Sequence, residues 1–517
     1  MGVFCAHLVH FFIFYAYTLI YFILSHNTLG AGNYHESIAL GIDVRKQLGL
    51  KTPKDKKTSV FAILKGYLKT NWLLGNRSAE ELAKLPELKN ERLIMGQRIL
   101  ELMEISCYQA QPTMFALLVF LLMDTSLIYG INASTCDAFT GCGVILCGGF
   151  GKIQKGREMA KAAELIMSKP EMKRCKSRSI FICEGLINHW SKPLRETLDP
   201  LLEGYRVGLE SGDGQSAGIC QSMHVTHTFY CGMPLEGDKE AEMIASIVGL
   251  QNDTTTVDSS AVIHTQEELD IHVIYLLGSK RLRGKEVQSE EQNFDEILKV
   301  AIKTDNQSLC GYIYAGHMEL KVIFGEWEGA LKLASQAGSK PRAALVATFT
   351  GIRFTFLVAL IFVKAAQLIK TDTITRSKWK MKAMKEIRTI RKWVKRGNPN
   401  VVHSLHLLEA ELASLNGKNN KAEQRFKSAI DTAEKNGFLQ DQALSNEMAS
   451  SYYKQRGDES NRDYHLKEAI ECYSRWGATA KADQLSGNKA SGNNQPLQAI
   501  AEIETDIGCT ASTNTEK

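Results

Sequence analysis

Apolar residues recur at every third or fourth position along most of this 517-residue chain, and short turns rich in Gly, Asn and Asp separate the runs. That period places the apolar side chains on one face of an α-helix, and the alternation typical of strands is scarce. Ser78 and Glu81 have the spacing of a capping box, in which each side chain satisfies a backbone N–H at a helix start. The pattern predicts amphipathic helices at 93–108, 113–130, 155–168, 195–210, 238–250, 265–279, 293–304, 342–370, 376–396, 402–415, 420–436, 440–455 and 461–476.

One spacing of small residues recurs within these helices. A glycine that ends one helix is followed, at offsets +5, +9 and +12, by residues on one face of the next helix. The glycine tolerates a left-handed turn, and a small residue at +5 lets the second helix lie close to the first. This is the helix-turn-helix unit of a tetratricopeptide repeat. The frame is occupied by Gly417, Ala422, Phe426 and Ala429; by Gly457, Arg462, Leu466 and Ala469; by Gly32, Ser37, Gly41 and Val44; by Gly151, Gly156, Ala160 and Ala163; by Gly212, Ala217, Gln221 and His224; and by Gly325, Ala330, Ala334 and Ala337.

The distances between these frames are irregular, so a non-repetitive α-bundle is the alternative to a repeat array. Arg462 stands where a small residue is expected, and this puts close packing of the last hairpin in question. On the pattern as a whole we predict an all-α, tetratricopeptide-like helical-hairpin superhelix, an α-solenoid, over residues 27–485.

The carboxy-terminal text carries a more specific likeness. The motifs that carry it are the turn at Asn398-Pro399, Glu409-Ala410-Glu411, Asn446-Glu447 and the ending Trp476-Gly477-Ala478. Through these motifs it resembles the tetratricopeptide-like helical region of large multidomain signalling proteins. Those proteins fuse a protein kinase, an AAA-type predicted ATPase and a histidine-kinase or adenylate-cyclase output. Earlier stretches such as "YHESIALGIDVRKQLGL" and "NHWSKPLRETLDPLLEGYRVGLESGD" are similar as well. The resemblance implies a regulatory or scaffolding role in signalling, with partner segments bound in the concave face of the array.

The chain carries no kinase Gly-rich loop followed by Val-Ala-x-Lys, no His-Arg-Asp catalytic loop and no Asp-Phe-Gly. We therefore expect a protein without an enzymatic activity of its own, a non-catalytic interaction scaffold. The alternative is a sensor or regulatory fragment of a kinase or ATPase whose catalytic domains lie outside this chain.

Composition restricts the class of protein, its partners and its cellular compartment. Apolar residues make up 44% and charged residues 23% of the chain, which are values typical of globular proteins, and a net charge of +5 predicts no general attraction to nucleic acid. The 12 cysteines include no Cys-x-x-Cys pair, and several stand in apolar runs. This usage indicates free, buried thiols in the cytoplasm.

Three apolar segments raise the question of a membrane. Residues 4–24 carry no formal charge and are long enough to cross a bilayer, so residues 1–26 are either a membrane anchor, with the repeat region in the cytoplasm, or a buried helix. The segments around Arg353 and Asp124 are interrupted by those charges, and we predict that both are buried helices. The polar tail at 486–517 is predicted to be disordered.

Candidate chemistry is weak. The stretch "CGVILCGGFGKIQKG" at 142–156 resembles a phosphate-binding loop, but Gly151-Lys152 is followed by Ile153 instead of Ser or Thr, and Leu146 stands where the first glycine is required. The pairs His224/His227 and His403/His406 lack a third ligand at metal-site spacing. We expect no catalytic residue, cofactor or metal.

Residues 376–396 hold ten Lys or Arg against one Glu, with Trp and Ile interleaved. On a helix this gives a basic amphipathic surface able to meet an acidic protein, anionic lipid or a calmodulin-like protein. The alternative is a solvated outer helix whose apolar stripe packs into the array. The basic residues singled out are Lys378, Lys382, Lys385, Arg388, Arg391, Lys392 and Lys395.

Overall fold

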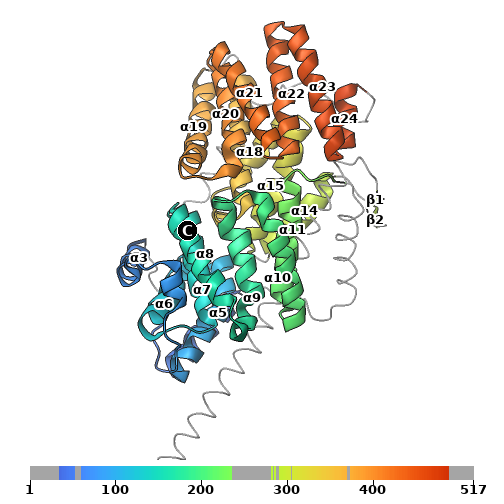
Figure 1. The fold of residues 1–517 in the computed structure, drawn as a ribbon. Coiled ribbons are helices and arrows are strands. Elements are labelled where there is room, and N and C mark those ends of the chain that lie inside the picture. The colour runs from blue at the N-terminus through green and yellow to red at the C-terminus, as the bar shows by residue number, and fades with distance from the viewer. Residues whose placement is uncertain are drawn as a thin grey trace, which may run out of the picture.

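The computed structural model describes residues 34–52, 60–235, 281–282, 285–286, 290–303, 305–368 and 373–487. The predicted all-α class is confirmed: across these residues the fold is helical, apart from a small antiparallel pairing of two two-residue strands (Figure 1). The segment 1–26, Gly32, the expected helices at 238–250 and 265–279 and most of the tail at 486–517 lie outside the described residues.

The amino-terminal half forms the lower part of Figure 1. Its α-helices are α2 (Tyr34–Gln47), α3 (Val60–Leu74), α4 (Ala79–Ala83), α5 (Glu91–Ala110), α6 (Pro112–Tyr129), α7 (Ser134–Val144), α8 (Ile153–Met167), α9 (Lys173–Ile182), α10 (Leu198–Ser211) and α11 (Gly214–Tyr230). Between them lie the π-helical turns η2 (Ile145–Gly149) and η4 (Cys183–Ile187) and the 3-10 turns η3 (Pro170–Met172), η5 (Asn188–Trp190) and η6 (Leu194–Thr197).

The carboxy-terminal half lies above it. It contains the strands β1 (Arg281–Leu282) and β2 (Lys285–Glu286), and the helices α14 (Glu290–Lys303), α15 (Gln307–Ile323), α16 (Trp327–Gln336), α17 (Lys340–Ala344), α18 (Phe349–Leu368), α19 (Thr373–Lys395), η7 (Pro399–Val401), α20 (Val402–Leu415), α21 (Asn419–Lys435), α22 (Leu439–Arg456), α23 (Glu459–Trp476) and α24 (Thr479–Ser486).

Polar caps define many helix starts. Ser78 and Glu81 form the predicted capping box, although it opens the five-residue α4, and the long α5 starts later. The side chains of Asn90, Asp213 and Asn306 accept the N–H three residues on, at the starts of α5, α11 and α15. Each cap satisfies a donor that has no partner within the helix.

One predicted helix is divided in two. The pattern at 342–370 predicts a single helix, but the chain breaks at Leu345–Thr348, between α17 and α18. The hydroxyl of Thr348 accepts the N–H of Gly351 and starts α18 anew. Gly351 is required there, because a Cβ on it would lie 2.0 Å from the carbonyl oxygen of Leu345. Apolar periodicity does not detect such a local cap.

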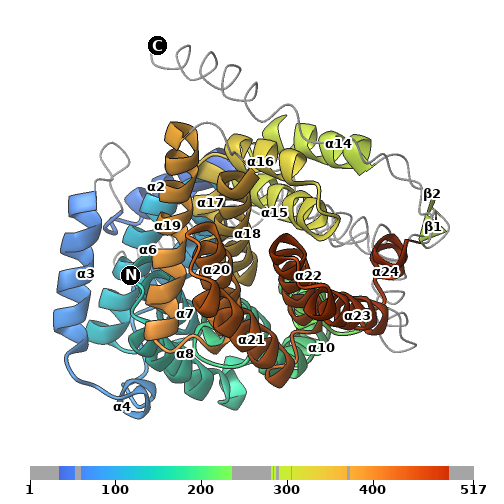
Figure 2. The ribbon, with the colours of Figure 1, turned by 90° about the horizontal axis from the view of Figure 1, so that it is seen from above.

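Left-handed glycines divide the last helices at a constant interval. Gly397, Gly417, Gly437, Gly457 and Gly477 lie twenty residues apart, and all have φ between 67° and 94°. Each ends a helix in a conformation that costs other residues energy. Helices α20 and α21, and then α22 and α23, form closely packed hairpins that follow each other at an interval of about forty residues (Figure 2).

The two apolar segments interrupted by a charge are the helices α18 and α6. α18 is long and apolar enough to span a membrane and is the one such helix among the described residues; its apolar stretch is buried inside the protein, as predicted. In α6, the buried Asp124 accepts hydrogen bonds from Lys69 and Thr70 of α3, at 2.5 Å and 2.8 Å. The charges that interrupt these segments are therefore paired inside the protein.

The two halves meet through side chains that satisfy backbone groups. The amide of Asn400 donates to the carbonyls of His189 and Lys192, at 2.7 Å and 2.8 Å, and its oxygen accepts the N–H of Leu194. Gln440 of α22 donates to the carbonyl of Tyr230 in α11 at 2.6 Å. These contacts fix the carboxy-terminal hairpins on the amino-terminal half.

Candidate functional site

The glycines of the repeat frame that the structure describes all lie at helix ends. Gly151, Gly212, Gly325, Gly417 and Gly457 all have left-handed φ, and a helix follows each. The small residue at +5 is buried in four of these frames, as Gly156, Ala217, Ala330 and Ala422. Ser37, Phe426, Ala429 and Ala469 are buried too, and Leu466 is half-buried. These residues position helices, and they bring no reactive groups together.

The stretch at 142–156 is a helix junction. The η2 turn ends at Gly149, Gly151 adopts φ +60°, and α8 starts at Ile153. A Cβ on Gly156 would lie 2.3 Å from Cys147 Sγ and 3.0 Å from the carbonyl oxygen of Gly143. The glycines therefore serve the close approach of α8 to the preceding helix.

Lys152 of the same stretch lies on the protein surface. Its exposed side chain donates to the hydroxyl of Tyr67 at 2.5 Å and lies over the ring of that residue.

The last hairpin packs closely despite Arg462. The guanidinium of Arg462 turns outward and pairs with Glu459 and Asp463 of its own helix, while its backbone carbonyl accepts a hydrogen bond from Ser450 of α22. Ala469 remains fully buried between the helices. A long side chain is tolerated at this position because it leaves the contact.

Helix α19 presents a basic surface to solvent. Its apolar stripe, including Trp379, Ile387 and Ile390, is buried against the neighbouring helices. In Figure 1 the helix lies at the left edge of the upper half of the fold. The residues of this basic face of α19, all exposed, are Lys378, Lys382, Lys385, Arg388, Arg391, Lys392 and Lys395.

The one acidic residue of α19 faces inward. Glu386 is buried and binds both terminal nitrogens of Arg342 in α17, one of them at 2.9 Å. On the outer side, Arg391 pairs with Glu409 of α20, which Arg425 also contacts. The rest of the exposed helix surface therefore keeps its positive character.

The inner helices of the hairpins are joined by buried ion pairs. Arg353 of α18 binds Glu319 of α15 and Asp441 of α22, the latter at 2.6 Å. Lys364 of the same helix binds Glu411 of α20 at 2.7 Å. Although burial raises the pKa of Asp441, the Arg353 guanidinium and His403 outweigh it and lower that pKa to about 2. These charges are used within the fold.

The two histidine pairs considered as metal ligands are hydrogen-bonded to other residues instead. His227 shares a 2.7 Å hydrogen bond with Thr197, and His403 shares one of 2.8 Å with Asp441. Burial lowers the pKa of His227 well below its usual value, so that ring is neutral. Among the described residues no three His, Cys, Asp or Glu side chains are grouped closely enough to hold a metal ion.

The cysteines that the structure describes lie in the protein interior. All ten are free and buried, as the sequence predicts. The sulfur atoms of Cys136 and Cys175 lie 3.3 Å apart between α7 and α9. Burial raises the pKa of thiols such as Cys142 and Cys220 to about 12, so they remain protonated.

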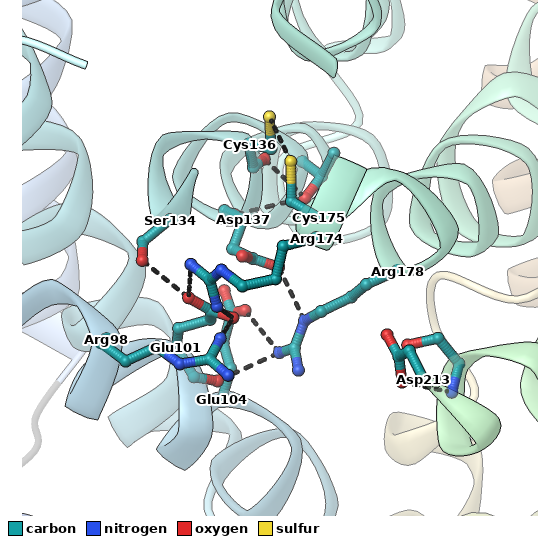
Figure 3. Close-up of polar contacts among 12 residues, drawn as sticks. Arg98, Glu101, Glu104, Ser134, Cys136, Asp137, Arg174, Cys175, Arg178 and Asp213 are labelled. Carbon is teal, nitrogen blue, oxygen red and sulfur yellow. Dashed lines mark hydrogen bonds and ion pairs between the residues drawn. The ribbon is translucent and has the colours of Figure 1, made fainter. Parts of the chain in front are cut away.

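A buried charge cluster, drawn in Figure 3, joins α5, α7 and α9. Nε of Arg178 donates to Asp137 at 2.6 Å, and its Nη2 donates to Glu104 Oε2 at 3.0 Å. Glu101 binds Arg98, Arg174 at 3.2 Å and Ser134 at 2.6 Å. Three arginines, of which Arg174 is exposed and the other two are half-buried, thus face three buried carboxyl groups.

The carboxyl groups of this cluster have unusual proton affinities. Burial raises the pKa of Glu104 to about 8, and the nearby Asp137 carboxyl raises it as well, against the lowering effect of Arg178. Burial also raises the pKa of Asp137. Desolvation disfavours the charged form, so Glu104 keeps its proton at neutral pH.

This cluster was not predicted from the sequence, although part of its signal is visible there. Glu101 and Glu104 lie three apart on one helix, and Arg174 and Arg178 four apart on another, so each pair shares a helix face. The spacing alone does not predict that these faces of α5 and α9 contact each other.

No known family model matches the sequence, and no curated protein matches it. The fold defines the chain as an all-α protein.

Proposed function

We propose that this protein is a non-catalytic interaction module of a signalling pathway, built on a tetratricopeptide-like array of helical hairpins. The hairpins at the carboxy end and the resemblance of residues 27–485 to the helical region of multidomain signalling proteins support this. A helical hairpin cannot bury its apolar face alone, so arrays of this kind are stable stacks that present long surfaces to partners.

The observation that carries the proposal is the basic face of α19. Seven cationic side chains are exposed on one helix while its carboxylate, Glu386, is buried and neutralised by Arg342. A surface of one sign attracts a partner of the other and speeds its association. The partner is a protein with an acidic segment.

The buried stripe of α19 favours one class of partner over the others. Calmodulin-like proteins and lipid surfaces bind an amphipathic helix through its apolar residues. In α19 the apolar residues Trp379, Ile387 and Ile390 are within the core. An acidic protein surface, in contrast, needs the charged side alone.

The expected concave-face site stays a prediction. The helices α18 and α22 at the inner side of the hairpins are buried along much of their length, and their charged residues Arg353 and Asp441 bind each other. We therefore place the first partner contact on the outer side, at α19. The alternative role, a sensor within a larger kinase or ATPase, would use the same face.

The first prediction concerns this face. Reversing three charges (Lys385→Glu, Lys392→Glu and Lys395→Glu) should weaken partner binding at least tenfold, because exposed charges act through electrostatic attraction. Proteins captured from cells by the full-length wild type and variant are compared by quantitative mass spectrometry. The affinity of the purified acidic partner is then measured at two salt concentrations.

The matched control reverses three exposed lysines on other outer helices (Lys427→Glu, Lys435→Glu and Lys467→Glu). Both triples change the net charge equally, so a specific α19 contact should be lost in the first alone. Equal capture by the two triples would contradict the proposal.

A membrane-anchored adaptor is the second candidate, and α3 favours it. Val60, Leu64, Leu68 and Trp72 form an exposed apolar row at helical spacing, with Trp72 78% exposed. The opposite face of α3 packs on α6 through Gly66 and Thr70. An exposed apolar stripe on a helix is typical of interfacial contact with lipid.

Its test is flotation of the full chain with phosphatidylcholine and phosphatidylserine vesicles. Leu68→Glu with Trp72→Glu should reduce the floated fraction at least fivefold, because two anchoring side chains become charged. Tyr464→Glu, at an exposed aromatic on α23, is the control and should leave flotation unchanged. Equal flotation of all three proteins would remove α3 from the membrane contact.

A further inference from the structure

A cavity of about 180 Å³ lies where the two halves of the fold meet, between α5, α7, α9, α11 and α15. Most of its wall is apolar, with Phe181, Leu186, Ile219, Leu309 and Leu345 among its residues. An engineered apolar cavity of about 150 Å³ holds a benzene molecule. The cavity therefore has room for one ring or a short alkyl chain.

One end of the cavity is polar. Glu104 and Arg178, both members of the charge cluster, line it. Glu104 Oε1 is buried without a hydrogen-bond partner among the described residues, and it lies beside Gly141, which also lines the cavity. Pockets with apolar walls and a few placed polar groups are typical of small-molecule sites.

Arg178 has a donor to spare. Its Nε and Nη2 are used by Asp137, Glu104 and the carbonyl of Glu101. Its Nη1 donates to no other residue in the part of the chain that the structure describes, and no dashed line reaches it in Figure 3. A guanidinium whose Nη1 donors are unused is suited to an anionic oxygen.

The charge of the cluster favours an anion. Since Arg178 donates to Glu104 Oε2 and the raised pKa of Glu104 keeps its carboxyl protonated, the proton belongs on Oε1, where it is a donor. Arg98, Arg174 and Arg178 then exceed the ionised carboxylates around them. Two donors, Arg178 Nη1 and the protonated Glu104, stand at the end of an apolar cavity.

The surrounding backbone is unusual at the same place. Helix α7 continues into the π-helical turn η2, and α9 continues into η4, which contributes Leu186 to the cavity wall. Single π-helical turns inside helices are frequent at functional sites. Here η4 contributes directly to the cavity wall, and η2 follows Val144 of α7, which also lines the cavity.

We propose that this cavity binds a small monocarboxylate with an apolar body of about one ring, its carboxylate accepting hydrogen bonds from Arg178 Nη1 and Glu104 Oε1. The site is separate from the basic face of α19, and the proposal does not depend on the proposed function. A ligand there would contact both halves of the fold.

The test uses phenylacetate and its neutral match, phenylacetamide, titrated into the full-length protein by isothermal calorimetry. The acid should bind with one-to-one stoichiometry, at least tenfold more tightly than the amide, because only the acid pairs with the guanidinium. Equal affinity for the two compounds, or no binding of the acid at millimolar concentration, would overturn the proposal.

Variants locate the binding. Met223→Trp, which fills the cavity from α11, should abolish binding of both compounds, and Arg178→Lys should weaken the acid at least tenfold and leave the amide unchanged. Glu104→Gln retains a donor and should preserve the acid within about threefold. The control is Arg174→Lys, in the same cluster but outside the cavity wall, which should bind like the wild type.

Circular dichroism and thermal unfolding identify any variant that fails to fold. In that case Ile219→Phe replaces Met223→Trp as the filling substitution. Binding of the acid that survives in a folded filling variant would place the ligand elsewhere and refute this site.

Discussion

Replacing Arg353 by Met should lower the free energy of unfolding by about 3–5 kcal/mol. The guanidinium is the shared partner of Glu319 and Asp441, and all three side chains are buried. Its removal leaves two carboxylates in the core with their main cation missing, and the desolvation of an unpaired charge is costly. Chemical denaturation monitored by circular dichroism measures the loss.

A matched substitution at an exposed arginine tests whether the loss of stability depends on the burial of the charge. Arg391→Met also removes an arginine that binds a carboxylate, Glu409, but its side chain is exposed. Exposed pairs contribute about 0–1 kcal/mol, so this variant should remain close to the wild type. Similar losses for both variants would show that Arg353 does not hold α15, α18 and α22 together through a buried charge.

The second large effect is expected at Gly156. Gly156→Ala should cost about 1–3 kcal/mol, because the new methyl group would meet Cys147 Sγ at 2.3 Å and the backbone carbonyl of Gly143 at 3.0 Å. Alanine normally stabilises a helix relative to glycine, so a net loss can be assigned to crowding. Thermal unfolding of the full chain measures it.

Gly149 supplies the control within the same stretch. A Cβ there meets only Ile145 Cγ2, at 3.9 Å, so Gly149→Ala should be neutral or slightly stabilising. Adding Cys147→Ala to Gly156→Ala should restore part of the loss by removing the sulfur, which a double-mutant cycle detects. Equal stability of the two alanine variants would contradict the proposed close approach of α8.

Local pattern was sufficient for the later helices of the fold. The predicted ranges 402–415, 420–436 and 440–455 differ from α20, α21 and α22 by at most a residue or so at each end. Their apolar period and terminal glycines are both short-range signals, so one stretch of sequence contains them whole. The sequence also contains a twenty-residue interval between glycines from Gly397 to Gly477. This interval is a stronger repeat signal than the offsets of +5, +9 and +12.

Helices rich in small or polar residues were harder to predict. α7 reads "STCDAFTGCGV" and α11 reads "GQSAGICQSMHVTHTFY", and neither has a clear apolar stripe. Both are helical because neighbours cover them on several sides: every residue of α7 is buried. Tertiary burial outweighs weak intrinsic propensity in such segments.

By itself, the sequence determined that this protein is all-α, where the turns of the carboxy-terminal hairpins fall and that α19 has a basic side. Only the tertiary structure decided that Arg353 meets Glu319 and Asp441, that Arg342 takes the one carboxylate of α19, and that Glu104 and Arg178 stand at the end of a cavity. The physical reason is the separation along the sequence of the residues that interact. Helix formation depends on residues three or four positions apart, whereas these pairings join residues that the stacking of whole helices brings together.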